Sequence, residues 1–168
     1  RLLKIDGYDI LHLHFPFFFG AELINLVSKR RRMPLVITYH QDVLLDGIKG
    51  LISKIYDRLI GSWVLKSAEK ILFTTLDYGK HAKVKWLFQE YPELISSLPN
   101  GVDINRFNPG LCGASIRDRY HIGKEITIIL LVAGLDKAHH FKGVDILLNA
   151  LKLADHNSLH LIIVGEGE

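Results

Sequence analysis

Histidines stand at the ends of two apolar segments in the first quarter of the chain. Val36-Ile-Thr-Tyr-His40 ends in a histidine, and Asp42 follows it after one glutamine. A neutral imidazole at a strand end can donate to a developing oxyanion or orient a hydroxyl, and a plain capping histidine is the alternative. His14 ends the segment 9–14, which also contains His12. We expect these two histidines to point to opposite faces of one strand, so that they could not bind one metal ion together.

A second group of residues suits an anionic ligand. The loop 132–143 contains Gly134 and Lys137 and ends in Lys142-Gly143. A glycine beside a helix start lets backbone N–H groups approach an anion, and a lysine adds a point charge; a solvated loop is the alternative. Gly165 follows an apolar segment, where it would let a ligand come close to the backbone.

Alternating strands and helices position both groups. We expect strands at 9–14, 34–39, 70–75, 95–98, 125–132 and 159–164, and helices at 22–32, 48–63, 78–90, 115–120 and 144–154. Apolar residues between 48 and 63 recur at helical spacing as one stripe, and Leu147, Leu148 and Leu151 point inward from the last helix. This alternation predicts an α/β fold with parallel sheets, whose ligands bind beyond the carboxyl ends of the strands.

The segment 97–109 divides the predicted elements. Pro99 biases its neighbour toward extended backbone, Asn100-Gly101 is a turn pair, and Pro109-Gly110 stops what precedes it. We interpret it as the last short strand of one domain running into a hinge, with domains at 1–108 and 109–168; an ordinary surface loop is the alternative.

Composition bounds the function. Hydrophobic residues make up 48% and charged residues 23% of the 168 positions, as in ordinary globular proteins. No apolar run reaches the roughly 18 residues that a membrane span needs. The single Cys112 cannot form an internal disulfide and fits a reducing compartment, and a net charge of +3 is too small to argue for nucleic acid. The run Lys29-Arg-Arg-Arg32 suits a solvated helix end or contact with anionic lipid.

Several of these segments resemble one enzyme family. Leu98-Pro-Asn-Gly-Val-Asp103 followed by Asn105-Arg-Phe-Asn-Pro109 resembles the inter-domain signature of the retaining glycosyltransferases of family 4, which have the GT-B fold. Residues 36–42 resemble the family's strand ending T-x-H-D, with Gln41 as an insertion. Residues 132–143 resemble its V-G-R-L…K-G loop, although Gly134 stands where the family has arginine. Residues 161–167 resemble its V-G-x-G strand end.

This resemblance implies a fold and a reaction. The chain would contain two Rossmann-like domains of GT-B type, both incomplete, from the middle of the enzyme. The enzyme would move a sugar, with retention, from a nucleoside-diphosphate sugar to a hydroxyl of a carbohydrate or lipid-linked acceptor, in polysaccharide, glycolipid or cell-envelope biosynthesis. No cofactor or metal is implied. We expect a cytoplasmic protein, with peripheral membrane contact through Lys29, Arg30, Arg31 and Arg32 as a further hypothesis, and we expect residues 1–168 alone to be inactive.

The resemblance also assigns residues. His40 would face the reacting sugar as the catalytic group, with His14 and Asp42 on the acceptor side. The donor would be bound by Gly134, Lys137, Lys142, Gly143 and Gly165, where Lys137 replaces the charge of the missing arginine. Another GT-B enzyme, such as a sugar-nucleotide epimerase or a phosphorylase, and a non-catalytic binding module or inactive fragment are the alternatives.

Overall fold

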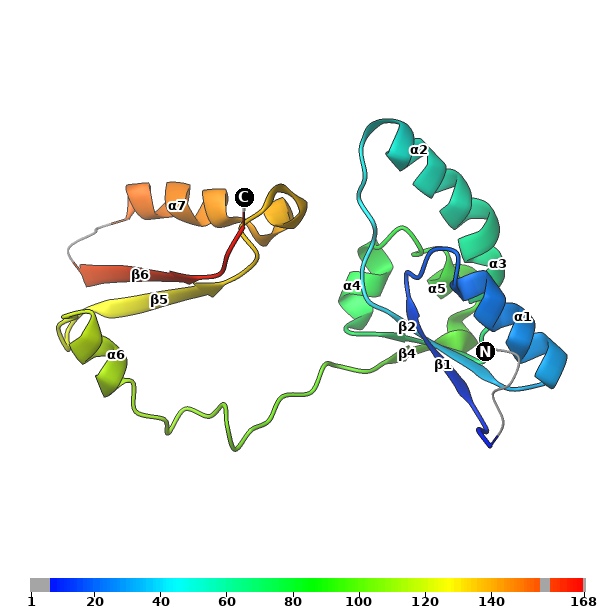
Figure 1. Cartoon of the computed structure of the whole chain (residues 1–168), viewed down its shortest axis with the longest axis horizontal. Helices are drawn as coiled ribbons and strands as arrows, with labels where there is room; N and C mark the ends of the chain where they lie inside the picture. The colour runs from blue at the N-terminus through cyan, green and yellow to red at the C-terminus, as the bar shows by residue number, and fades with distance from the viewer. Residues whose placement is uncertain (1–6, 155–157, 168) are drawn as a thin grey trace. The chain divides into compact units, whose positions relative to one another are not determined.

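The computed structural model describes residues 7–154 and 158–167, without the side chains of residues 137 and 138 (Figure 1). The chain forms two compact units, Arg1–Val102 and Asp103–Glu168. Each contains strands that pair in parallel, so the predicted α/β class is confirmed. The division lies within the segment 97–109, a few residues before the boundary that we drew after residue 108.

The first unit is built on a four-stranded parallel sheet. Its strands are β1 (Leu11–Phe15), β2 (Leu35–Tyr39), β3 (Lys70–Phe73) and β4 (Ile95–Ser97), in the order β1-β2-β3-β4. Parallel neighbours cannot be joined by a tight turn, so each pair is linked by a helical crossover. The first crossover is α1 (Ala21–Arg31), which ends at Arg32 in a left-handed conformation with φ 54°.

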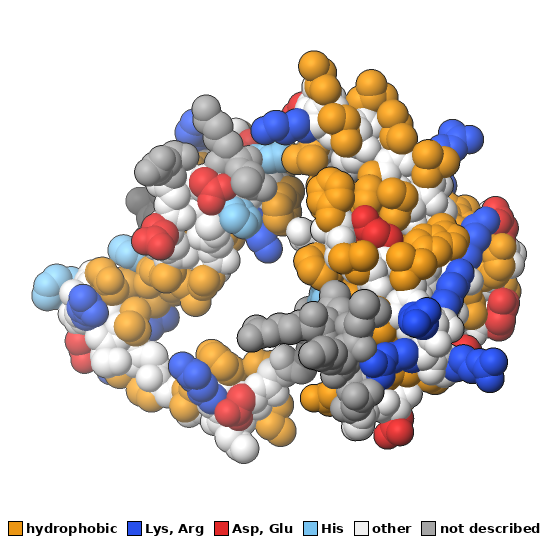
Figure 2. All heavy atoms as spheres, turned by 45° about the vertical axis from the view of Figure 1, so that its right-hand side comes forward, with side chains coloured by type: hydrophobic (Ala, Val, Ile, Leu, Met, Phe, Trp, Pro, Cys, Tyr) orange, Lys and Arg blue, Asp and Glu red, His pale blue; other side chains and the backbone are white. Residues whose placement is uncertain are grey.

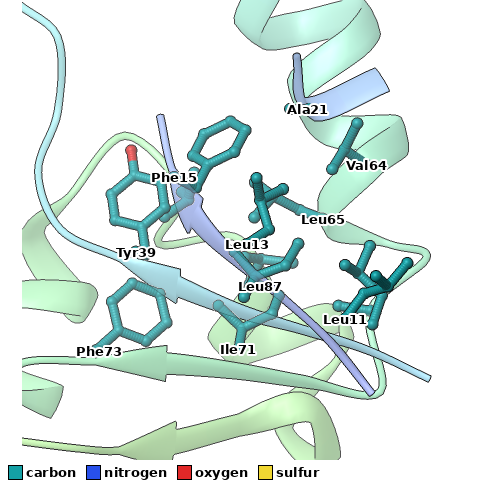
Figure 3. Close-up of a cluster of buried hydrophobic side chains, with 14 of the residues drawn as sticks. Leu11, Leu13, Phe15, Ala21, Tyr39, Val64, Leu65, Ile71, Phe73 and Leu87 are labelled. Atoms are coloured by element: carbon teal, nitrogen blue, oxygen red, sulfur yellow. The ribbon is translucent and has the colours of Figure 1, made fainter. Parts of the chain in front are cut away.

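One face of this sheet makes the hydrophobic core. Alternate residues of β1 point to the same side, and Leu11, Leu13 and Phe15 are all buried there. They lie together with buried side chains from β2, β3 and the crossovers (Figure 3): Ala21, Tyr39, Val64, Leu65, Ile71, Phe73 and Leu87. The other residues of β1, His12 and His14, are exposed. At β1 the second face of the sheet is therefore accessible for polar chemistry, whereas Thr38 on the same face of β2 is buried.

The second crossover is a helical run with an irregular middle. It consists of α2 (Gly47–Tyr56), a π-helical segment η2 (Asp57–Gly61) and α3 (Ser62–Leu65). The predicted helix over 48–63 is confirmed, but most of its apolar stripe does not pack on the core, although the half-buried Ile60 does. Gly50, Ser53 and Tyr56 are the buried residues of α2, whereas Ile48 is 79% exposed.

The third crossover differs from the single helix that we expected over 78–90. It contains α4 (Leu76–His81), α5 (Leu87–Glu90) and the 3₁₀ turn η3 (Pro92–Leu94). Ala82 ends α4 with extended backbone, φ −69° and ψ 164°. Because Ala82, Val84 and Leu87 are all buried, the chain bends at this point to bring each of them onto the core.

The second unit is smaller. It contains α6 (Ala114–Arg119), β5 (Thr127–Val132), the 3₁₀ segment η4 (Lys137–Lys142), α7 (Val144–Leu153) and β6 (Leu159–Val164), with β5 and β6 paired in parallel. Leu147 and Leu151 are half-buried, but Leu148 is 43% exposed. The expectation that Leu148 points inward was wrong, because two strands offer too narrow a surface to cover the whole apolar side of α7. Among the described residues, no helix has both the length and the apolar character needed to cross a bilayer.

Candidate active site at the strand ends

His14 and His40 meet at the carboxyl ends of β1 and β2. The register pairs Phe15 with Tyr39, and the backbone N–H of His40 donates to the carbonyl oxygen of Phe15 at 2.9 Å. His14 Nδ1 and His40 Nε2 are 2.7 Å apart, and the two rings stack at 5.0 Å between centroids. Since a neutral imidazole has one donor and one acceptor nitrogen, one ring donates and the other accepts. The pair thus couples the tautomers of the two rings.

This coupling decides what His40 can offer a substrate. If His40 donates through Nε2–H, its Nδ1 is an unprotonated base; if Nε2 accepts, Nδ1–H is a donor that can bind a hydroxyl or an oxyanion. Either tautomer of His40 can serve group transfer. The hydrogen bond with His14 determines which of the two tautomers is present.

His12 belongs to the same cluster, which corrects our expectation for this strand. Residues two apart in a strand share a face, and the rings of His12 and His14 lie 4.7 Å apart. His12 Nε2 is also 2.8 Å from Thr38 Oγ1. Partial desolvation of its ring lowers the pKa of His12, and the charges of His14 and His40 lower it further. Among the described residues, no group of three or more His, Cys, Asp or Glu side chains could hold a metal ion.

Asp42 holds the loop that carries His40. Its carboxylate accepts a hydrogen bond from Tyr39 Oη at 2.6 Å and from the backbone N–H of Lys83 at 3.1 and 3.2 Å. Its own N–H donates to Tyr78 Oη at 2.7 Å. Burial, and then the bond to Asp42, raises the pKa of Tyr39 well above its usual value. Through these contacts Asp42 anchors the loop after β2. Contact of Asp42 with an acceptor remains a prediction.

A cavity of about 280 Å³ adjoins this anchored loop. Phe15 and Tyr39 line it from the strand ends, Asp57 from η2 and Lys83 from the turn after α4. Lys83 Nζ donates to the carbonyl oxygen of Val43 at 2.6 Å and lies 3.7 Å from Asp57 Oδ2. Burial raises the pKa of Asp57, and the charge of Lys83 opposes that rise. Sequence reasoning missed this cavity, because Asp57 and Lys83 are remote in the chain and belong to segments predicted as plain helices.

In the second unit, the loop after β5 folds around Asp136 and His139. The Nδ1 atom of His139 lies 3.0 and 2.9 Å from the two carboxylate oxygens of Asp136. A Cβ atom added at Gly134 would lie 2.8 Å from that same Nδ1. The imidazole therefore occupies the space in which the arginine side chain of the family pattern would begin. Gly134, Asp136 and His139 also line a cavity of about 340 Å³.

The remaining predicted donor-side residues lie around the start of α7 and the end of β6. Gly143 precedes α7 with φ 70°, a left-handed conformation that favours glycine, and the exposed Lys142 has its Nζ 5.2 Å from the Phe141 ring centroid. A Cβ at Gly165 would lie 1.8 Å from the carbonyl oxygen of Ala133, so packing of β6 on the end of β5 already requires this glycine. The side chain of Lys137 lies outside the described part of the structure.

A family model described as Glycosyltransferase Family 4 matches residues 1–106 of this chain. The chain belongs to glycosyltransferase family 4. The match covers the whole unit that carries the histidine cluster, and the parallel sheets fit a Rossmann-like GT-B fragment. A glycogen synthase of Clostridium botulinum (strain Alaska E43 / Type E3) is 28% identical, over 73% of this chain. The aligned part is 29% of that synthase, so the chain spans about a third of its length.

Proposed function

We propose that this chain is part of a glycosyltransferase that moves a sugar, with retention, from a nucleoside-diphosphate sugar to an acceptor hydroxyl. The observation that carries the proposal is the hydrogen-bonded pair of His14 and His40 at the carboxyl ends of β1 and β2, in a unit matched by the family model. Ligands of parallel α/β sheets bind at this edge. A polysaccharide, glycolipid or cell-envelope acceptor fits the proposal.

In this reaction the bond between the anomeric carbon and the diphosphate oxygen breaks, and the oxygen keeps the electron pair. A bond forms from the acceptor oxygen to the same carbon, and the acceptor proton passes to the leaving diphosphate oxygen. His40 orients the sugar and acceptor hydroxyls, with His14 setting its tautomer. A substrate that uses Nε2 of His40 must displace His14, whereas one that uses Nδ1 need not.

On the donor side, Lys142 and the backbone N–H groups that follow Gly143 at the start of α7 stabilise the leaving diphosphate. Gly134, Gly165 and Lys137 complete the proposed donor site. His139 holds the position next to Gly134, so a lost arginine charge is supplied by lysine and backbone rather than from residue 134.

A panel of nucleoside-diphosphate sugars incubated with the complete gene product tests the proposal. We expect transfer, or slow hydrolysis to the free sugar, for at least one donor. Epimerisation of the donor without release of nucleoside diphosphate, or phosphorolysis of a glycan, would instead assign another GT-B activity. We expect residues 1–168 alone to show no turnover, because the aligned part of the chain is only 29% of the glycogen synthase that it resembles.

A further inference from the structure

The helix α2 buries its small and polar side and exposes its apolar side. Its buried residues are Gly50, Ser53 and Tyr56, which are small or polar. Its apolar residues lie on the opposite side, and they continue into η2 as a row that we call the α2 face: Ile48, Leu51, Ile52, Ile55 and Leu59, exposed by 79, 59, 59, 52 and 66%. An amphipathic helix on a water-soluble unit normally directs such a row to the core. The α2 face instead points away from the core, so we expect another apolar surface to cover it.

One neighbouring segment extends the α2 face. Lys29 Nζ lies 4.8 Å from the ring centroid of Trp63, one turn beyond Leu59. The basic run at the end of α1 is thus attached to the apolar surface. Figure 2 shows hydrophobic side chains gathered on the first unit, with Lys and Arg side chains beside them.

Charge favours an anionic surface as the partner. Residues 17–63 contain seven Lys and Arg against four Asp and Glu. One of those acids, Glu22, accepts a hydrogen bond from Tyr56 Oη at 2.6 Å, and Asp42 is used by the loop anchor. An apolar helix face bordered by lysine and arginine is the pattern of helices that lie in the plane of a bilayer. The same composition would leave the cations without partners in an ordinary apolar protein interface.

The exposed apolar residues of the second unit have a different origin. Leu130 and Val132 belong to a sheet of two strands, which cannot cover both of its own faces. The α2 face instead belongs to a helix whose opposite side already packs within its unit, so a further strand or helix is not needed to complete that packing.

We propose that the α2 face inserts into the interfacial layer of an anionic lipid bilayer, with Trp63 beyond its C-terminal end and the α1 basic run on the lipid phosphates. The helix would lie parallel to the membrane plane. This inference does not depend on glycosyl transfer, and it can fail or succeed separately from the proposed activity.

Sedimentation of the full chain with vesicles tests the inference. The probes are vesicles of phosphatidylcholine alone and of phosphatidylcholine with about 30% phosphatidylglycerol, at low salt. The variant Leu51→Ser/Ile55→Ser should bind anionic vesicles roughly 10-fold more weakly or worse. Its matched control is Ile146→Ser/Leu153→Ser, which removes two apolar residues of α7 that are more exposed than Leu51 and Ile55 and should bind like the wild type.

A second pair of variants tests the charge. Arg30→Gln/Arg32→Gln should weaken binding to anionic vesicles by roughly 30-fold and leave binding to neutral vesicles unchanged. Lys80→Gln/Lys85→Gln removes the same charge from exposed positions of the third crossover and should have little effect. With Trp86→Phe, Trp63 becomes the only tryptophan, and its emission should shift to the blue on anionic vesicles.

Three results would overturn the inference. The first is wild-type chain that stays in the supernatant with anionic vesicles at low salt. The second is an equal loss of binding in the α7 control and the α2 variant. The third is concentration-dependent self-association in ultracentrifugation that Leu51→Ser/Ile55→Ser abolishes while vesicle binding is unaffected, which would make the α2 face an interface between copies of the chain.

Discussion

At the scale of single residues, the histidine pair is the part of the candidate site with the most direct test. In the complete enzyme, His40→Ala should lower kcat by roughly 10²–10⁴-fold, the range for one positioned acid–base or oxyanion group. His14→Ala should lower kcat less and shift the pH profile, because it acts through the tautomer of His40. His81→Ala is the control, since its ring bonds the Asp77 carbonyl oxygen within α4. Near wild-type kcat for His40→Ala would leave His40 with a structural role only.

His12 should make stability depend on pH. Partial desolvation and the neighbouring histidines lower its pKa below the ordinary 6.5, so the folded chain keeps it neutral where the unfolded chain binds a proton. The unfolded state then gains protons as the pH drops through about 6.5, and the free energy of unfolding falls. His12→Gln, which keeps a hydrogen-bonding group near Thr38, should lessen this fall.

Urea unfolding of the wild type and His12→Gln at about pH 7.5 and about pH 5.5 measures the effect. The two proteins differ only at residue 12, so the difference between their pH dependences reports the contribution of His12. Identical pH dependences would mean that the neighbours do not disfavour its protonated form.

Sequence reasoning found the residues of this cluster but not its arrangement. The positions of His14 and His40 followed from the predicted ends of the strands, because apolar runs that end in a polar residue mark the edge of a buried sheet. Placing His12 and His14 on opposite faces contradicted the two-residue period of a strand. The bonds that join Asp42 to Tyr78 and Lys83 link residues 36 and 41 positions apart, and no local pattern reports such contacts.

At the scale of elements, the loop into α7 carries the donor-side prediction. Lys142→Ala should weaken binding of a nucleoside diphosphate by about 1.5–3 kcal/mol, as for a charge-assisted hydrogen bond. Lys137→Ala should weaken binding of the nucleoside diphosphate by less than Lys142→Ala does. Lys152→Ala, near the other end of α7, is the matched control for loss of one charge. Calorimetric titration of the complete enzyme measures all three, and an unchanged affinity in Lys142→Ala would remove this loop from the donor site.

Packing in the third crossover depends on Gly79. An added Cβ there would lie 2.6 Å from Phe88 Cζ and 2.9 Å from Phe73 Cδ1, so Gly79→Ala should lower the free energy of unfolding by about 1–3 kcal/mol through overpacking. This clash should outweigh the gain of about 1 kcal/mol that alanine brings to an open helix. Gly101→Ala is the control, because nothing lies within 4 Å of its added Cβ. A Gly79→Ala chain as stable as the wild type in urea would contradict this account.

The elements themselves show why pattern reasoning succeeds and where it stops. Strands with continuous Ile, Leu and Val, such as β5 and β6, were predicted within two residues of their observed bounds. The π-helical η2 and the bend at Ala82 were not, since both accompany packing between segments that are distant in the chain, which local propensity does not report. The direction of the apolar stripe of α2 was equally hidden, because periodicity identifies a face but not what covers it.

At the scale of the whole molecule, the segment between the units is its least protected part. Every residue from 97 to 116 is exposed, and the hydrogen bonds between 103 and 110 are local, such as those from the N–H groups of Asn105 and Arg106 to Asp103 Oδ1. Prediction of this hinge from sequence relied on proline and glycine positions, which act locally and so can be interpreted without knowing the fold.

The exposed turn at Arg106 makes the segment a protease substrate. Arg106 is the only Lys or Arg between residues 98 and 113, and proteases cut first at exposed, locally bonded loops. Brief trypsin digestion should therefore cleave after Arg106 before other sites, as mass spectrometry of the products can check, with Arg106→Gln as the resistant control. The larger product would be residues 1–106, the range that the family model matches. Digestion would thus separate the histidine cluster from the proposed donor loop with a single cut.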